Sequence, residues 1–423
     1  MGDDTIADVE RRLTDAVRRR EGERVQFLRK LVRTPSLTGY EAEIQDLLES
    51  AFAGAGLEVR TQQLDAERIG SFLPTVAGSD LSARPNVIGA LRGGGGGRSL
   101  LLNAHVDTVL PGDEARWTHP PFSGALIDGE VWGLGACDMK AGLVACLFAL
   151  VAIRDAGIAL RGDIVLAATV GEESGGAGAI GYALDEAPTD AAIVAEPTGL
   201  AVAPAHAGAV QWRVTLEGRA AHACLRETGV SAIEKFVSLH GFLQAYERQR
   251  IATVEHALFA TVGNPVPLNV GIVRGGDWAI AVPDRVTVEG RLGLVPGEDI
   301  DAVCDEFAAQ VAEWADADAW LCDHRPLLEW TGVRFAPSEV SADHDLVETA
   351  VTAFEATQER RPQIKGMTYG TDMTHFNRIA GIPTILFGPG DMALAHRNDE
   401  RVPVEQLHAA TSVLALTAAQ WCA

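Results

Sequence analysis

Residues 99–108 read SLLLNAHVDT. The first part, 99–104, is a nearly continuous apolar run, which is typical of a strand buried on both faces of a parallel sheet. His105 and Asp107 follow it directly. In open α/β sheets, sites form in the crevice outside the carboxyl ends of the strands. The stretch therefore predicts a buried strand that carries polar side chains to a site.

The same pattern recurs further along the chain. DIVLAATV (163–170) precedes Glu172 and Glu173, and AAIVAE (191–196) ends on Glu196. Each of these acids alone would be an ordinary helix cap or a solvated turn residue. Because the carboxyl ends of parallel strands meet at one edge of a sheet, we expect the acids to lie together.

Two further segments add to this edge. GACDMK places Asp138 just before an apolar helix predicted at 139–153, and AHRNDE places His396 after a strand predicted at 382–388. No comparable supply of Lys or Arg accompanies these acids.

The alternation of strands and helices predicts the α/β class, with a mostly parallel central sheet and helices on both faces. A further strand is predicted at 86–92, and helices are predicted at 5–33 and 39–54. The glycine run 93–97 leads into a strand rather than a helix, so we interpret it as a hairpin connection and not as a phosphate-binding loop.

The middle of the chain has a different pattern, which predicts a ferredoxin-like β-α-β-β-α-β insert with a last strand near Trp320. We expect a catalytic domain in two parts, 1–206 and 327–423, with the insert at 207–326 between them.

Composition excludes several classes of protein. The chain has 423 residues, 47% of them hydrophobic, and a net charge of −23, so it suits two domains and repels nucleic acid. The longest strongly apolar stretch, 143–153, is too short to span a membrane, and the acidic start is no secretory signal. The six cysteines form no CxxC pair, which is typical of reduced thiols in the cytoplasm.

Carboxylates gathered at one sheet edge repel one another unless a cation lies between them or some are protonated. The five segments offer, as candidate ligands, His105 or Asp107, Asp138, Glu172 or Glu173, Glu196 and His396. Two imidazoles with carboxylates suit zinc, manganese or cobalt. Five ligands are too many for one tetrahedral ion, and they suit two ions sharing one carboxylate, which can lower the pKa of water from about 16 toward 7. Asp107 can accept the second imidazole N–H of His105.

The motifs also occur together in a known order. HVDTVLPG, WTHPPFSGALIDGEVWGLGACDMKAG, TVGEESGG, AEPT, GRAAHA, LNVGIVRGG, YGTD, FGPG and AHRNDERV run through the chain from about residue 25 onward. This series resembles the acetylornithine deacetylase, succinyl-diaminopimelate desuccinylase and aminoacylase family of dinuclear metallohydrolases. The resemblance implies a zinc-peptidase-like catalytic domain and a lid domain that forms a homodimer.

By this resemblance, Asp138 bridges two divalent ions. His105 and Glu196 complete one metal position, and Glu173 and His396 complete the other. Glu172 matches the general base, which takes a proton from the attacking water and delivers it to the leaving nitrogen. The Asp138–Met139 peptide is expected to be cis.

The resemblance also assigns roles in the insert. His222 matches a histidine that stabilises the oxyanion at the partner subunit's site, and Asn269 matches a substrate-binding asparagine. Arg291 is a candidate for binding a substrate carboxylate, or else it forms a salt bridge within the lid. Gly370 matches a backbone contact region, and Asp372 is expected to be structural.

The expected substrate is a small N-acyl amino acid or a similar carboxylate-bearing molecule. Leu134 and Cys224 depart from residues common in the family, so a ureido or carbamoyl substrate, or hydrolytic deamination, stays open. A scaffold without catalysis is a further alternative, although every expected ligand is present.

A different class of function has one motif. GAGAIG places Gly176, Gly178 and Gly181 in the spacing of a dinucleotide fingerprint, with Glu196 about twenty residues later. In that motif the glycines turn straight off the strand, whereas EESG intervenes here. An NAD-dependent oxidoreductase would also leave His105, Asp138 and His396 without a role.

Overall fold

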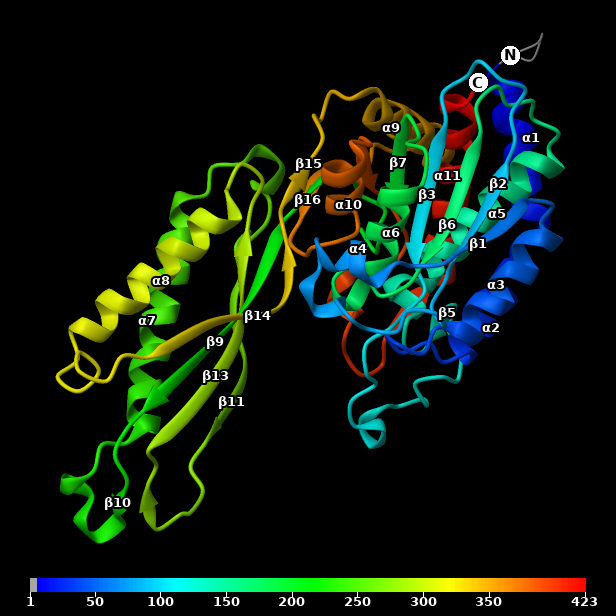
Figure 1. The fold of residues 1–423 in the computed structure, drawn as a ribbon. Helices are drawn as coiled ribbons and strands as arrows, with labels where there is room; N and C mark the ends of the chain where they lie inside the picture. The colour runs from blue at the N-terminus through cyan, green and yellow to red at the C-terminus, as the bar shows by residue number, and fades with distance from the viewer. Residues whose placement is uncertain (1–5) are drawn as a thin grey trace. The chain divides into compact units, whose positions relative to one another are not determined.

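The computed structural model describes residues 6–423, which form two compact units (Figure 1). The first unit comprises 6–205, Glu339–Lys365 and Thr371–Ala423. The second unit comprises His206–Ser338 and Gly366–Gly370. Residues 1–5, which carry part of the predicted first helix and of the chain start judged not to be a signal, lie outside the described residues.

A mixed nine-stranded sheet forms the centre of the first unit. Its order is β1 (Glu58–Gln62), β2 (Asn86–Leu91), β6 (Ile164–Thr169), β3 (Leu100–His105), β7 (Ala191–Val194), β17 (Thr384–Leu386), β8 (Val202–His206) and β15 (Ser338–Glu339), and β16 (Ile364–Met367) also pairs with β8. The four strands β6, β3, β7 and β17 are parallel, and β1, β2 and β8 pair antiparallel. The sheet is therefore mixed rather than mostly parallel as predicted, and its parallel part is limited to the centre, where the apolar runs lie.

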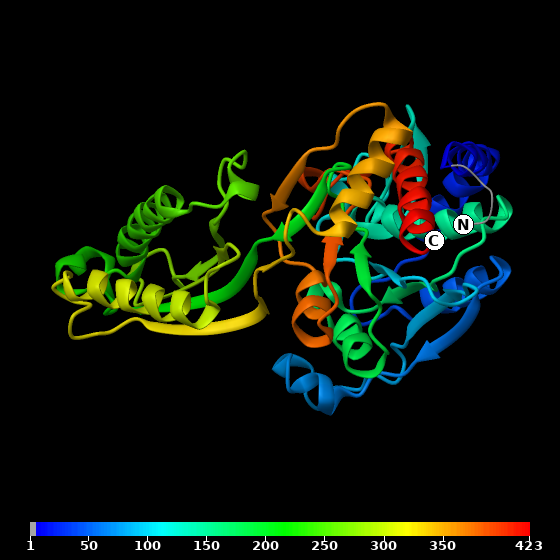
Figure 2. The same ribbon diagram turned by 90° about the horizontal axis from the view of Figure 1, so that it is seen from above.

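The α/β class with helices on both faces is confirmed. One face carries α5 (Ala141–Asp155), α9 (Asp345–Gln358) and α11 (Val404–Trp421), with α1 (Ile6–Arg19) and α2 (Glu21–Arg33) packed on them. The other carries α3 (Ala42–Gly54), α6 (Ala177–Asp185) and the short α4 (Ala66–Gly70) and α10 (Met373–His375) (Figure 2). The predicted helix 5–33 is two helices, because the chain leaves helical geometry at Arg20.

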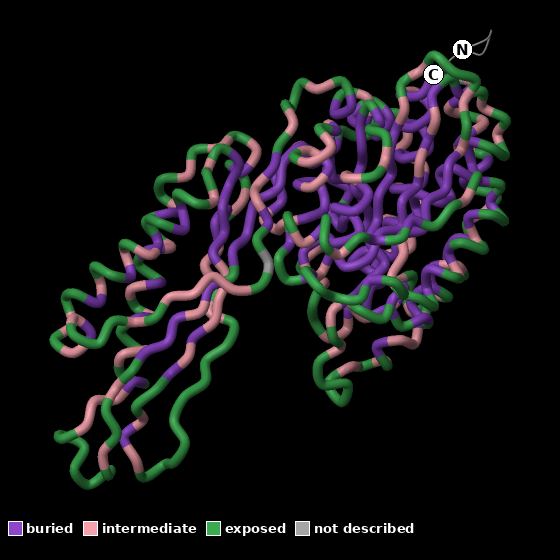
Figure 3. The backbone as a smooth tube through the Cα atoms, viewed as in Figure 1, coloured by how far each residue is buried: buried purple, intermediate pink, exposed green. Residues whose placement is uncertain are grey.

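The core lies between these layers, where buried residues dominate (Figure 3). α5 is buried on almost every side. The run Ala136–Asp155 is long and apolar enough to cross a membrane by length and composition alone. The longest apolar stretch, predicted as 143–153, was therefore underestimated. Residues 136–153 of this run are buried inside the protein, as in a core helix.

The hairpin predicted for the glycine run is wrong, because β6 lies between β2 and β3. The run instead packs against the turn that precedes β6 in the chain. Gly93 N–H donates to Asp163 Oδ1 at 2.8 Å, and Gly94 N–H donates to Leu160 O at 2.9 Å. The partner of a strand that far along the chain could not be read from local sequence.

The second unit has the predicted ferredoxin-like order. Its antiparallel sheet runs β11 (Leu268–Gly275), β13 (Arg285–Leu294), β9 (Gly208–Glu217) and β14 (Leu327–Phe335), and α7 (Ala232–Thr253) and α8 (Ile300–Asp316) cover one face. A short pair, β10 (Ala221–His222) and β12 (Ala281–Val282), lies apart from it.

The last strand of this unit begins after Trp320, not near it. Asp318 Oδ1 accepts the N–H groups of Trp320 and Leu321 at 2.9 and 3.0 Å, which closes a turn there. β14 follows and pairs with β9, so residues 327–335 belong to the second unit and the boundary predicted at 326 is displaced.

A small three-stranded sheet stands beside the main sheet in the first unit. It joins β4 (Ala125–Ile127), β5 (Glu130–Trp132) and β18 (Arg401–Pro403). β18 follows the loop that carries His396, so this sheet fixes the end of that loop.

Candidate metal centre

His105 is the last residue of β3 and is buried. Its Nδ1 lies 3.0 Å from the main-chain oxygen of Asp107, and its Nε2 lies 3.1 Å from Asp138 Oδ1. A carbonyl oxygen can only accept, so Nδ1 carries a proton and Nε2 faces the acid. Asp107 therefore accepts the N–H of His105 Nδ1 through its main-chain carbonyl, since its carboxylate oxygen Oδ1 lies 3.7 Å away.

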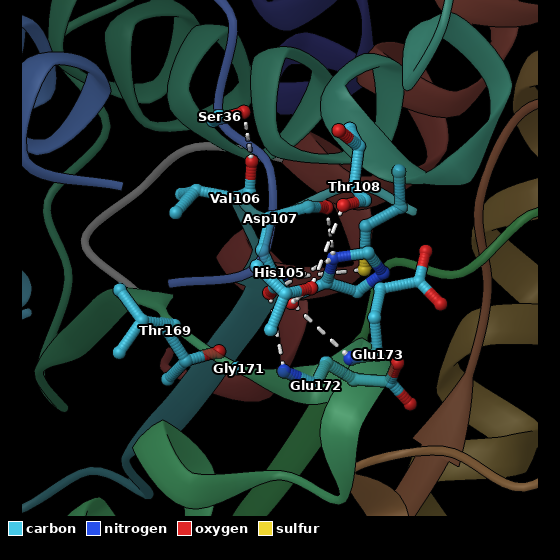
Figure 4. A network of polar contacts seen from close by, with 12 residues as sticks. Ser36, His105, Val106, Asp107, Thr108, Thr169, Gly171, Glu172 and Glu173 are labelled. Atoms are coloured by element: carbon cyan, nitrogen blue, oxygen red, sulfur yellow. Dashed lines mark hydrogen bonds and ion pairs between the residues drawn. The ribbon is translucent and has the colours of Figure 1, made fainter. Parts of the chain in front are cut away.

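The carboxylate of Asp107 instead holds the acidic turn after β6. Its Oδ1 accepts the N–H of Glu172 at 3.1 Å, and its Oδ2 accepts the N–H of Glu173 at 3.3 Å (Figure 4). Oδ2 also accepts the hydroxyl of Thr38 at 2.8 Å. Asp107 is fully buried. Its side chain therefore fixes Glu172 and Glu173 relative to the end of β3.

Asp138 lies in the turn before α5, and its peptide bond to Met139 is cis, as expected. Its two oxygens face different histidines: Oδ1 lies 3.1 Å from His105 Nε2, and Oδ2 lies 3.4 Å from His396 Nε2. Burial alone would raise the pKa of Asp138, but the hydrogen bonds to the two histidines outweigh it and lower this pKa.

His396 lies in the loop before β18, with a backbone φ of 55°. Its Nε2 lies 3.1 and 3.0 Å from the two oxygens of Glu173. Hydrogen bonds to Asp138 and Glu173 raise the pKa of His396 to about 11. The same nitrogen can bind a cation only after losing that proton, so a metal would take the place of the proton between the imidazole and the two acids.

Glu196 and Glu172 add two buried acids. Glu196 follows β7 and is 2% exposed, and Glu172 follows β6 and is 7% exposed. Burial raises the pKa of Glu196, and the charge of Asp138 raises it further. Burial also raises the pKa of Glu172; the charge of His105 opposes this and that of Glu196 adds to it.

The donor set fits divalent metal ions. Ligand atoms of His105, Asp138 and Glu173 lie within 4.8 Å of one another, and His396 contacts the last two. The buried Lys140 does not neutralise these acids, because its Nζ donates to the main-chain oxygens of Leu31 and Thr34 at 3.1 Å each. Imidazole nitrogens and carboxylates are ligands of zinc and related metals.

Several contributors were not found from the sequence. Thr38 contacts Asp107, and Glu400 accepts the N–H of Asp138 at 3.1 Å. Asp372, expected to be structural, is buried beside Thr169, and burial raises its pKa to about 7. The only sequence signal for Glu400 was its position four residues after His396. Its contact to Asp138 joins residues far apart in the chain, and such contacts leave no local sequence pattern.

The second unit holds the other candidates. His222 is exposed, and its Nδ1 accepts the N–H of Cys224 at 3.2 Å. Asn269 on β11 is exposed and faces Arg291 on β13 in register. Arg291 donates to Thr368 O at 2.9 Å, and among residues 6–423 no carboxylate forms an ion pair with it, contrary to the salt-bridge alternative. Gly370 packs against Phe335 so closely that a Cβ there would clash.

The structure argues against the dinucleotide alternative. Gly176 begins α6 only after the short helix Glu172–Ser174. A Cβ added to Gly176 would meet His375 and Asp372, one added to Gly178 would meet Asn86, and one added to Gly181 would meet Leu64. The glycines thus allow close packing of protein atoms and leave no space for a pyrophosphate.

Comparisons with known proteins identify the family of the chain. Residues 101–420 match Peptidase family M20/M25/M40. The chain is 30% identical over 357 residues to N-formyl-4-amino-5-aminomethyl-2-methylpyrimidine deformylase of Bacillus subtilis, covering 80% of this chain and 83% of the relative. It is 26% identical over 362 residues to a probable succinyl-diaminopimelate desuccinylase of Staphylococcus aureus, covering 79% and 86%.

Solved structures share the fold. Human carnosine dipeptidase 1 superposes with a TM-score of 0.76 at 14% identity, covering 98% of this chain and 99% of that one. A tripeptidase of Staphylococcus aureus superposes with a TM-score of 0.69 at 22% identity, covering 94% and 98%. The chain therefore belongs to Peptidase family M20/M25/M40 and is a metal-dependent hydrolase.

Proposed function

We propose that the first unit binds two divalent ions and hydrolyses an amide bond of a small N-acylated compound. His105, Asp138 and Glu196 hold one ion, and Glu173, His396 and Asp138 hold the other. The observation that carries this proposal is the position of Asp138, whose two oxygens face two different histidines. Zinc is favoured by the two imidazoles, and manganese and cobalt suit the same ligands.

Bound divalent ions supply Lewis acidity, which polarises the substrate carbonyl and lowers the pKa of water. Glu172 provides the base. Its carboxyl is buried, and burial raises its pKa above the usual range of a glutamate. A raised pKa makes the carboxylate a stronger base. In this role Glu172 removes a proton from the attacking water and delivers it to the leaving nitrogen.

His222 can stabilise the oxyanion that forms on the substrate. A main-chain N–H can only donate, so Nδ1 of His222, which receives the N–H of Cys224, carries no proton in the neutral ring. The proton then lies on Nε2 and is available as a donor. We assign His222 to the site of a partner subunit.

This assignment requires a homodimer, which we place at the second unit. β11 is an edge strand with mostly exposed residues (Figure 3), and such edges pair readily with another chain. Exposed apolar side chains gather in the same unit: Leu225, Ile233, Val237, Ile272, Val273, Trp278, Ile280 and Leu327. Val273→Lys on β11 should give monomers in sedimentation velocity with an unchanged circular dichroism spectrum, and an intact dimer would contradict this interface.

The six cysteines are free thiols, which supports a cytoplasmic enzyme.

The two relatives suggest different substrates. The name of the deformylase describes a formamide without a carboxylate, whereas that of the desuccinylase describes a substrate with several. Arg291 favours the carboxylate-bearing substrate. Its side chain is partly buried and has no carboxylate partner among the described residues, so its guanidinium can bind a substrate carboxylate through a bidentate pair of hydrogen bonds. We therefore expect an N-acyl amino acid or a related carboxylate-bearing substrate, with Asn269 beside it.

A turnover screen tests the function. Metal-free protein is loaded with zinc, manganese or cobalt and assayed on N-formyl, N-acetyl, N-succinyl and N-carbamoyl amino acids and on an N-formyl aminomethylpyrimidine. We expect metal-dependent hydrolysis of the carboxylate-bearing compounds and a raised KM for them in Arg291→Met. Hydrolysis of the pyrimidine alone would contradict the substrate class, and no hydrolysis with any metal would contradict the proposed function.

A further inference from the structure

The loop that carries His396 is tied to the turn that carries Asp138. Glu400, four residues after His396, is 1% exposed. Its Oε1 accepts the N–H of Cys137 at 2.9 Å and that of Asp138 at 3.1 Å, and its main-chain oxygen accepts the N–H of Gly133 at 2.9 Å. Both the side chain and the backbone of Glu400 thus bind the segment that leads into Asp138.

The neighbours of Glu400 hold the same loop to other parts of the first unit. Asp399 accepts the N–H and the hydroxyl of Thr118, both at 2.7 Å. Arg401 donates to Glu130 at 2.9 Å and lies over the ring of Trp132, 4.6 Å from its centre. These contacts fix the loop, but they do not reach Asp138.

A second contact links the loop and the turn. The thiol of Cys137 lies 3.3 Å from Asp391 O, on the other side of His396 in the sequence. A thiol is a weak donor, whereas the carboxyl oxygen Oε1 of Glu400 accepts two main-chain N–H groups, at 2.9 and 3.1 Å. The larger part of the tie therefore belongs to Glu400.

We propose that Glu400 is a positioning residue that holds Asp138 and His396 at the separation the second metal position requires. This inference rests on the proposed two-metal function. The position formed by Glu173, His396 and Asp138 uses both tied segments, whereas the one formed by His105, Glu196 and Asp138 uses only one. Loss of the contacts of Glu400 therefore weakens metal binding by Glu173, His396 and Asp138 more than metal binding by His105, Glu196 and Asp138.

The test compares variants of Glu400 in the full chain. Glu400→Leu keeps the volume and removes the acceptor, and Glu400→Gln keeps an acceptor oxygen. Zinc and cobalt are titrated into the metal-free proteins by calorimetry, and the absorption spectrum of bound cobalt reports the ligand set. We expect Glu400→Leu to bind the ion at the position of Glu173, His396 and Asp138 about 10- to 100-fold more weakly, which is typical when a partner of a metal ligand is removed, with a smaller change for the other ion. Glu400→Gln should restore most of that loss.

The control is Glu298→Leu in the second unit. Glu298 also accepts a main-chain N–H, from Val295 at 2.8 Å, and it pairs with Arg250. The Glu298→Leu substitution should lower the melting temperature of the metal-free protein and leave both metal affinities unchanged. If Glu400→Leu does not fold, Glu400→Asp, which shortens the side chain by one methylene, takes its place with the same expected order of losses.

The possible results separate the two proposals. Wild-type protein that binds two ions, together with a folded Glu400→Leu or Glu400→Asp that binds both as tightly or loses both equally, would overturn the role of Glu400. Failure of Glu400→Gln to recover affinity would also overturn it. Wild-type protein that binds no zinc or cobalt would instead contradict the two-metal function.

Discussion

Replacing Asp107 by Asn tests how the acidic turn is held. In the wild type, Oδ1 accepts the N–H of Glu172, and Oδ2 accepts the N–H of Glu173 and the hydroxyl of Thr38. An Asn side chain has only one acceptor oxygen. If this oxygen takes the place of Oδ2, it keeps two donors, and its NH2 group then faces the N–H of Glu172.

The magnitude follows from that one lost acceptor. A buried donor left without a partner costs about 1–3 kcal/mol. We assume that this free energy adds to the activation barrier, because it displaces Glu172 in the transition state. Since about 1.36 kcal/mol corresponds to tenfold in rate, kcat should drop about 5- to 150-fold. Thr38→Val is the matched control, because it removes one hydroxyl donor and leaves both main-chain contacts, so a loss of less than about tenfold is expected.

The assay measures kcat at saturating metal, metal content after dialysis, and unfolding in urea for both variants. Asp107→Asn should lose rate while keeping its bound metal, because Asp107 contacts His105 through a main-chain carbonyl that the substitution preserves. An unchanged kcat in a folded, metal-loaded Asp107→Asn would refute the reasoning, as would a larger loss in Thr38→Val than in Asp107→Asn.

Three further outcomes are expected. Glu172→Gln should lower kcat by about 10²- to 10⁴-fold, the usual contribution of a general base, and keep its metal in elemental analysis; turnover near the wild-type level would contradict the assigned role. His222→Ala should likewise lose rate rather than metal, and loss of metal in a folded protein would argue against an oxyanion role. Burial and the charge of Arg24, whose Nη2 lies 2.7 Å from Nδ1 of His408, lower the pKa of His408 below 6.5. The unfolded chain then binds the proton more readily, so His408 contributes stability above about pH 6.5 that is lost as pH falls below it, and urea unfolding at pH 5.5 and 7.5 should show a smaller difference in His408→Gln than in wild type.

The sequence predicted the location of the site well for a physical reason. Parallel strands end at the same sheet edge, so the residues after β3, β6 and β7 had to be neighbours once the apolar runs were identified as strands. His105, Glu172 and Glu196 follow this rule directly. The expectation that Asp138 bridges two ions came instead from the resemblance to a family.

Contacts between distant segments were beyond that reasoning. Glu400 and Asp138 are separated by 262 residues, and nothing in AHRNDE shows that its last acid is buried. The role of Asp107 depended on which of its oxygens faces His105, and residue spacing cannot decide this. β2 pairs with β6 rather than with its neighbour β3, because sheet order is set by the packing of the whole unit.

The most direct test of the central claim is a crystal structure of the zinc-loaded enzyme with anomalous scattering recorded at the zinc edge. The account predicts two zinc peaks in each chain, one on either side of Asp138, with His105 and Glu196 bound to one and Glu173 and His396 bound to the other. A single peak, or two peaks that do not share Asp138, would contradict it.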